Sequence, residues 1–316
     1  MSRSPVASRS NEFGDRFYVW TATGTTELFW SVTTLIGMGF PKFLHLWYAK
    51  LVAELAYDEL AAPCRRSRAA QLALWAARGR AYVAELQALG LLKTIKLAKM
   101  GDREAALRYL KGQPERVRDA AGDRGSAVHQ TIEDLALDAV RDAVELLREG
   151  DPLPEWDSTI APYMVGFANW HRMWRPRFEA TEFTVFNRVA QYAGTGDALV
   201  WIWLDGDWRL VLVDWKTVKE LRAEVGLQLA AYRRGEFIGM PNGHEVPMPE
   251  VYATFALHLF PPTEANPLGF AFCPIRSDDE IYREFRYVLE TARFRMEVAN
   301  SVVGAPMAAP QIPEAA

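Results

Sequence analysis

The chain has 316 residues, half of them apolar, and a formal net charge of −4 at pH 7. This composition is typical of a globular protein with a sizeable core, and it argues against a positive coat over the whole surface. Two cysteines, Cys64 and Cys273, are too few for a four-thiolate zinc or iron–sulfur site within one chain, and they do not indicate a secreted disulfide scaffold.

The first half of the chain, up to residue 122, predicts a β-hairpin followed by helices. Residues 1–16 offer little apolar surface and are expected to be disordered. Aromatic and threonine residues at 17–30 predict a hairpin with a turn near Gly24, after which Ser31 can cap a short helix. Another helix begins at Pro41. Further helix-forming segments, which continue past this half, are residues 68–90, 102–111, 124–149 and 158–175.

Residues 123–300 are expected to form the second part of the chain, in which the sequence changes to the period of β-strands after residue 180. A helix over 224–237 separates the third expected strand from the fourth, so we expect the fourth to pair in parallel with a neighbour. Ser277 and Glu280 form a capping box for a last helix. Residues 301–316 are expected to be a disordered tail. The five expected strands are residues 182–189, 196–204, 208–215, 251–260 and 269–275.

These patterns predict an α/β protein in which a mixed sheet core follows a largely helical N-terminal half. The polar N-terminus has no apolar signal segment, and no apolar run approaches the roughly 18 residues of a membrane span. We therefore expect a cytoplasmic protein without a membrane partner.

Charged residues lie at the adjoining ends of two expected strands. Asp197 begins one strand and Asp214 ends the next, and the tight turn at 205–207 makes these strands antiparallel neighbours. Both carboxylates should therefore lie at one rim of the sheet. Lys216 shares a face with Asp214, because residues i and i+2 of a strand point to the same side, whereas Trp215 points into the opposite layer.

Two carboxylates this close repel each other unless a positive charge holds them. Lys216 supplies one positive charge, and a divalent cation would supply two more. Oxygen ligands on a rigid strand end suit Mg²⁺ or Mn²⁺, which could polarise a phosphoryl oxygen and activate a bound water. Lys216 could orient that water or stabilise developing charge. A simple ion pair between Asp214 and Lys216 remains the structural alternative.

Three further residues are placed to reach this rim. Gln228 and Tyr232 lie one turn apart on one face of the helix after Lys216, and His129 lies near the start of an expected helix. A polar helix edge and a packed histidine are the ordinary alternatives. In chain order the motifs are RGSAVH, EFTVFN, GTGD, VDWKT and QLAAY.

This ordered set resembles that of the RecB-type nucleases of the PD-(D/E)XK superfamily, and most closely that of the Cas-four-like exonucleases encoded by bacteriophages. The likeness covers about residues 17–298. It implies a restriction-endonuclease-like mixed sheet with flanking helices. It also implies a Mg²⁺- or Mn²⁺-dependent DNA exonuclease, acting on DNA ends or single strands in phage recombination, replication or DNA processing.

The resemblance implies a role for each matching residue. Asp197 and Asp214 would bind the metal, with His129 and the backbone carbonyl of Trp215 as further ligands. Lys216 would be the catalytic lysine.

The glutamine–tyrosine motif of the family matches Gln228 and Tyr232, which would contact the catalytic site or the nucleic acid. Glu182 matches an acidic residue that precedes the first catalytic strand and would support the site. The chain lacks the four cysteines of the cluster-containing Cas-four proteins, so we expect no iron–sulfur cluster. Candidate protein partners are a recombinase, a single-strand-binding protein or a helicase in the cytoplasm of a bacterial host.

Residues 78–124 carry eleven Lys and Arg against six Asp and Glu. This segment predicts a basic helical arch over the site that could hold a phosphate backbone, although a solvated helix surface would look the same. Three alternatives to an exonuclease stay open. They are an endo-acting or structure-specific nuclease, a catalytically silent DNA-binding accessory protein on the nuclease fold, and an unrelated α/β protein.

Overall fold

The structure is a computed structural model of the chain, and it describes residues 8–10, 15–22, 25–40, 113–142 and 153–307. The sheet belongs to a unit formed by residues 1–41 and 127–316. The expected helices over 68–90 and 102–111, and the basic segment as far as residue 112, lie outside the described residues. The helical N-terminal half and its arch therefore stay predictions.

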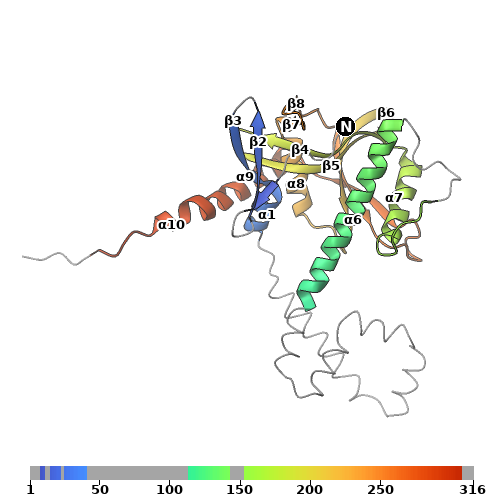
Figure 1. The fold of residues 1–316 in the computed structure, drawn as a ribbon, viewed down its shortest axis with the longest axis horizontal. Coiled ribbons are helices and arrows are strands. Elements are labelled where there is room, and N and C mark those ends of the chain that lie inside the picture. Colours follow the sequence, from blue (N-terminus) through green and yellow to red (C-terminus); the bar gives the residue numbers. More distant parts are fainter. Residues whose placement is uncertain (1–7, 11–14, 23–24, 41–112, 143–152, 308–316) are drawn as a thin grey trace, which may run out of the picture. The chain divides into compact units, whose positions relative to one another are not determined.

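The described residues form an α/β fold around one mixed sheet of ten strands, most of which pair antiparallel (Figure 1). The strands are β1 (Ser8–Ser10), β2 (Arg16–Ala22), β3 (Thr25–Ser31), β4 (Arg177–Asn187), β5 (Tyr192–Leu204), β6 (Asp207–Lys216), β7 (Phe237–Gly239), β8 (Glu245–Pro247), β9 (Ala253–Leu259) and β10 (Phe270–Ile275). β9 pairs with β6 in parallel, as expected for a strand that follows a crossover helix.

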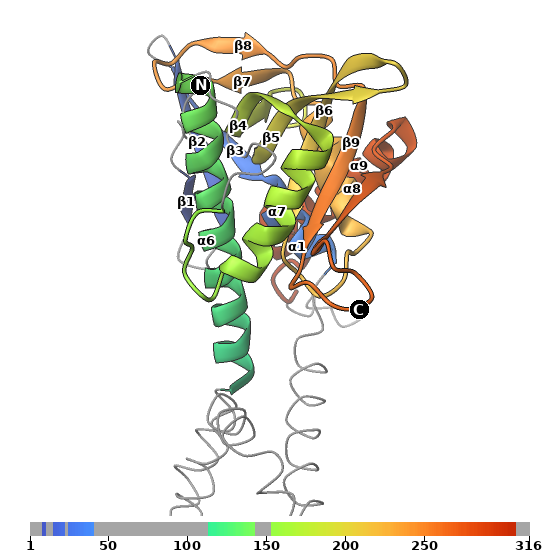
Figure 2. The same ribbon diagram turned by 90° about the vertical axis from the view of Figure 1, so that its right-hand side faces the viewer.

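Helices cover both faces of the sheet (Figure 2). α1 (Val32–Gly39), α8 (Glu224–Arg233) and α9 (Asp279–Arg293) bury one core, which includes Leu35, Leu229 and Phe285. α6 (Gln113–Asp142) and α7 (Ala161–Trp174) bury the core on the opposite face, which includes Val128 and Trp170. A short π-helix, η1 (Phe294–Val298), and α10 (Ala299–Val302) continue from α9. No described helix combines the length and the apolar character that crossing a bilayer requires.

The predicted N-terminal hairpin is confirmed, but it belongs to the main sheet. β3 pairs in parallel with β5 through Trp30 and Ser31, so β2 and β3 extend the same sheet that carries the predicted core strands. Ser31 occupies the N-cap position of α1 as predicted, yet its hydroxyl contacts Thr33 rather than a backbone N–H. Within the expected disordered N-terminus, β1 pairs with β2.

Two helix starts differ from prediction. α6 begins at Gln113, eleven residues before the expected start, because a long helix accommodates interior glycines at about 1 kcal/mol each. The predicted capping box of Ser277 and Glu280 at the start of α9 is wrong. Asp278 is the N-cap, and its carboxylate accepts hydrogen bonds from the backbone N–H groups of Glu280 and Ile281. Ser277 is instead buried, where its hydroxyl is hydrogen-bonded to that of Thr254.

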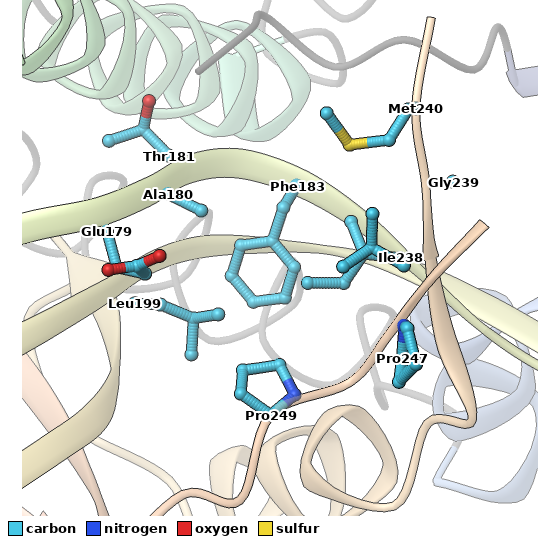
Figure 3. A pocket seen from close by; sticks show the side chains of 11 residues that line it. Glu179, Ala180, Thr181, Phe183, Leu199, Ile238, Gly239, Met240, Pro247 and Pro249 are labelled. Carbon is cyan, nitrogen blue, oxygen red and sulfur yellow. The ribbon is translucent and has the colours of Figure 1, made fainter. Parts of the chain in front are cut away.

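A mostly apolar pocket lies beside β4 and the short β7–β8 hairpin, an unpredicted element (Figure 3). The ring of Phe183 forms part of its wall, among the other lining side chains. Its lining residues are Glu179, Ala180, Thr181, Phe183, Leu199, Ile238, Gly239, Met240, Val246, Pro247 and Pro249. None of the residues singled out from the sequence lines this pocket, so the candidate site lies elsewhere.

Candidate metal centre at a fork in the sheet

One edge of β5 has two different partners along its length. β3 pairs with it at Tyr192 and Ala193, and β6 pairs with it from Ala198 onward. Between these pairings, residues 194–197 have no strand partner on that edge among the described strands, because the end of β6 continues beside β9 instead. The sheet therefore forks here, and the predicted site residues gather around the fork.

The side-chain alternation of β5 breaks at Asp197. A Cβ at Gly196 would lie 2.5 Å from the ring of Phe183, in the core under α8, whereas Ala198 lies in the core under α6. In a regular strand, positions 196 and 198 would share a face. Glu182 occupies the facing position of β4 and has a φ of 44°. A non-glycine residue adopts this left-handed conformation at a cost of about 1–3 kcal/mol, and such strain is concentrated at functional sites.

His129 of α6 meets both irregular strand positions. Its Nδ1 lies 3.5 Å from Oδ1 of Asp197 and 3.9 Å from Oε1 of Glu182. One ligand atom from each of these three residues lies within 4.8 Å of the other two. Neighbouring Val128 and Ile132 are fully buried, so the packing of α6 on the sheet fixes where His129 points. The three side chains form the first cluster of the site.

The backbone of Trp215 joins the first cluster to the end of β6. Its N–H donates to Oδ2 of Asp197 at 2.6 Å, and its carbonyl oxygen lies 3.0 Å from Nε2 of His129. The indole is buried and packs edge-on against Trp170 and Phe167 in the opposite layer, as predicted. The side chain therefore anchors the strand end, while the backbone orients the carboxylate and the imidazole.

A second cluster surrounds Asp214. Nζ of Lys216 lies 2.5 Å from Oδ2 of Asp214, which confirms that the two side chains share a face. Nε2 of Gln228 donates to Oδ1 of Asp214 at 3.1 Å and to the hydroxyl of Tyr232 at 3.3 Å. A Cβ at Gly194 would lie 2.3 Å from the buried ring of Tyr232. Glycine at 194 is therefore what lets this ring approach β5.

Electrostatic interactions shift the pKa values of the first cluster. Burial alone would lower the pKa of His129, but the charge and hydrogen bonds of Asp197 and Glu182 raise it to about 10. Burial opposes ionisation of Asp197, yet its pKa is lowered because His129, Lys216 and the Trp215 N–H stabilise the carboxylate. At neutral pH this cluster therefore contains an imidazolium next to a carboxylate.

The second cluster keeps its lysine charged. Burial raises the pKa of Asp214 to about 6, with a further contribution from the charge of Asp197, although Lys216 opposes the shift. Burial would lower the pKa of Lys216, but Asp214 and Asp197 raise it. Above pH 7 the second cluster is therefore an ammonium–carboxylate pair.

The charges and donor atoms fit a divalent cation. Glu182, Asp197 and Asp214 carry three formal negative charges against one on Lys216 and one on the His129 imidazolium. Replacing the imidazolium proton by a dication would bring the sum of these charges to zero. Carboxylate oxygens suit Mg²⁺ and Mn²⁺, and imidazole is a common ligand of transition metals.

All eight predicted site residues gather at the fork, with two differences from their expected arrangement. Glu182, expected only to support the site, lies in the first cluster. Asp214, expected in the same metal set as Asp197, is held by Lys216 and Gln228. Two residues of the fork were missed, Tyr18 and Thr195, whose hydroxyls lie 3.0 Å apart. Side-chain alternation along the predicted hairpin could have placed Tyr18 on the inward face. It could not have shown that Tyr18 lies beside Thr195, because that contact depends on how the hairpin joins β5.

Comparison of the chain with models of known protein families found no match, and comparison with curated proteins found none either. The geometry of the fork and the ordered motifs are therefore what a functional proposal can rest on.

Proposed function

We propose that the protein is a Mg²⁺- or Mn²⁺-dependent nuclease that hydrolyses phosphodiester bonds in DNA as an exonuclease. The convergence of His129, Glu182 and Asp197 within 4.8 Å, next to the buried Asp214–Lys216 pair, carries this proposal. The motif order shared with the RecB-type nucleases supports it, and the choice of DNA and of exonuclease action rests on that resemblance.

His129, Glu182 and Asp197 would hold the metal ion. Nδ1 of His129 faces the two carboxylates, so this nitrogen would be the ligand atom, and Nε2–H would donate to the carbonyl of Trp215. A hydrogen bond from the second ring nitrogen to a carbonyl is the usual way to orient a metal-binding imidazole. The carbonyl of Trp215 is therefore better suited to orient His129 than to bind the metal. A bound ion would polarise a phosphoryl oxygen and lower the pKa of a coordinated water.

Lys216 would stabilise negative charge in the transition state. Its pKa is raised, so its ammonium group keeps its proton and donates rather than acting as a general base. Asp214 holds the ammonium group in place, and Gln228 holds Asp214 from the other side. Tyr232 fixes the amide of Gln228 through its hydroxyl. This chain of contacts fixes the direction of the lysine relative to the first cluster.

The test is digestion of end-labelled linear DNA, single- and double-stranded, with Mg²⁺, Mn²⁺ or a chelator. Asp214→Asn and Lys216→Met preserve side-chain size while removing charge, and Glu284→Gln on exposed α9 is the matched control. We expect metal-dependent loss of label that is at least a hundredfold slower in the first two variants and unchanged in the third. Circular DNA that resists digestion would support exonuclease action. DNA binding without cleavage under any metal would contradict the enzymatic proposal and favour an accessory protein.

A further inference from the structure

The N-terminal hairpin brings an arginine to the open edge of β5. Arg16 begins β2, and its guanidinium donates to the hydroxyl of Tyr18 while lying 5.2 Å from the centre of that ring. Tyr18 is buried, and its hydroxyl lies 3.0 Å from Oγ1 of Thr195, in the stretch of β5 that lacks a described strand partner on this edge. Arg16 itself is exposed. The buried phenol thus fixes a solvent-facing cation beside the fork.

The charge of Arg16 is not neutralised by any carboxylate of the described residues. Arg188, by contrast, binds the carboxylates of Glu27 and Glu245. Arg16 is oriented by a neutral hydroxyl and by contact with an aromatic ring. A guanidinium is planar and has five N–H donors, so one hydrogen bond to Tyr18 leaves other donors for an anion from solvent.

Arg16 lies on the same side of the sheet as the first cluster. Tyr18 packs with Ala193 in a third, smaller core. Tyr192 and a Cβ at Gly194 would face the core under α8, so Ala193 and Thr195 lie on the opposite face of β5. Asp197 follows two residues later, about 7 Å along the strand, and its contact with His129 of α6 places its carboxylate on the face opposite α8.

We propose that Arg16, oriented by Tyr18, is a phosphate-binding subsite of the nuclease. It would hold a phosphate of the DNA strand that flanks the phosphate being hydrolysed. This inference rests on the proposed function. The two clusters carry a formal charge of −1 without metal, so a polyanionic strand needs a nearby cation to approach them. Arginine binds phosphate through parallel N–H donors, which fixes direction as well as affinity.

The experiment measures binding of a short single-stranded oligonucleotide in chelator, where cleavage does not occur, over a range of salt concentrations. The variants are Arg16→Gln and Tyr18→Phe, with Arg283→Gln on exposed α9 as the control for a lost charge. Arg16→Gln should weaken binding about ten- to a hundredfold, as expected for a lost charge-assisted contact. It should also reduce the slope of log affinity against log salt by about 0.7. Arg283→Gln should change neither quantity.

A second arm replaces one phosphate at a time by a neutral methylphosphonate. The wild type should lose affinity at one flanking position, and Arg16→Gln should be insensitive at that position, because the contact is already absent. Tyr18→Phe should weaken the same position by a smaller factor, because the arginine loses its hydroxyl partner.

The outcomes separate this inference from the proposed function. Arg16→Gln binding with wild-type affinity, salt slope and methylphosphonate profile, in a wild type that cleaves DNA, would overturn the subsite alone. A wild type that neither binds nor cleaves DNA would overturn both. A position-specific loss of binding without any cleavage would support the subsite and contradict hydrolysis.

Discussion

The two clusters at the fork contain the same acid in two different settings. Asp197 meets His129 and Glu182, whose side chains are 28% and 21% exposed. Asp214 is only 2% exposed at its side chain and is bound by Lys216 and Gln228. The first cluster has accessible ligand atoms, whereas the second already contains its own cation. Two aspartates at adjoining strand ends thus suit two roles, metal binding and lysine positioning, and their neighbours make the difference.

The largest expected effect comes from removing the charge of Asp197. Asp197→Asn replaces a charged ligand and partner of His129 by a neutral amide, so we expect Mn²⁺ affinity to fall at least a hundredfold and DNA cleavage to be lost. Isothermal titration with Mn²⁺ measures the first effect and digestion of labelled DNA the second. A Mn²⁺ affinity within threefold of the wild type would show that Asp197 does not bind the metal. The two clusters would then not have different roles.

Lys216→Met should separate the two clusters. The first cluster keeps its ligand atoms, so Mn²⁺ affinity should change less than tenfold, while cleavage should fall about 10²- to 10³-fold. The free energy of unfolding at pH 8 should drop by about 3–5 kcal/mol, because a buried carboxylate loses its partner.

The double variant Asp214→Asn with Lys216→Met removes both charges and should recover most of that stability in urea unfolding. An equal loss of metal binding and cleavage in Lys216→Met would show instead that both clusters act as one metal site.

Protons should compete with the metal at the first cluster only. In the metal-free protein the pKa of His129 is about 10, so binding through Nδ1 at pH 8 must displace its proton. Affinity for Mg²⁺ should therefore rise about tenfold per pH unit between pH 7 and 9, with release of about one proton. Calorimetry in two buffers of different ionisation enthalpy measures the release. His129→Gln should bind more weakly and without this pH dependence.

Two glycines of β5 offer a smaller, structural comparison. Gly194→Ala places a methyl group against the ring of Tyr232, which is buried and joined to Gln228, so about 1–3 kcal/mol of stability should be lost together with activity. Gly196→Ala pushes on Phe183, which borders the pocket of Figure 3 and has room to move. Urea unfolding should therefore show a smaller loss for Gly196→Ala, and a larger loss would contradict the assigned packing.

Strand geometry alone was enough to predict much of this site. The turn after Leu204, where Asp205 and Gly206 have positive φ, makes β5 and β6 neighbours, and the period of two then brings Asp214 and Lys216 to one face. The same pairing predicts that Asp197 and Asp214 lie close together, because each is one position beyond the last pair of that ladder, Ala198 with Val213.

Other features depend on tertiary contacts that no local pattern contains. Glu182 reaches the first cluster because its backbone is left-handed within a strand. Regular strand periodicity does not predict such a conformation for a non-glycine residue. Two adjacent residues, Ser277 and Asp278, could each cap α9, and burial of Ser277 against Thr254 decides between them. The fork itself depends on where β3 meets β5, a pairing between segments more than 150 residues apart.

The most direct test of the proposed metal centre is anomalous diffraction from crystals soaked in Mn²⁺. We expect one strong peak between His129, Glu182 and Asp197, at about 2.0–2.3 Å from Nδ1 and the two carboxylates, with Lys216 still bound to Asp214. A peak at Asp214 with the lysine displaced, or no peak at the fork in a protein whose DNA cleavage requires Mn²⁺, would contradict this expectation.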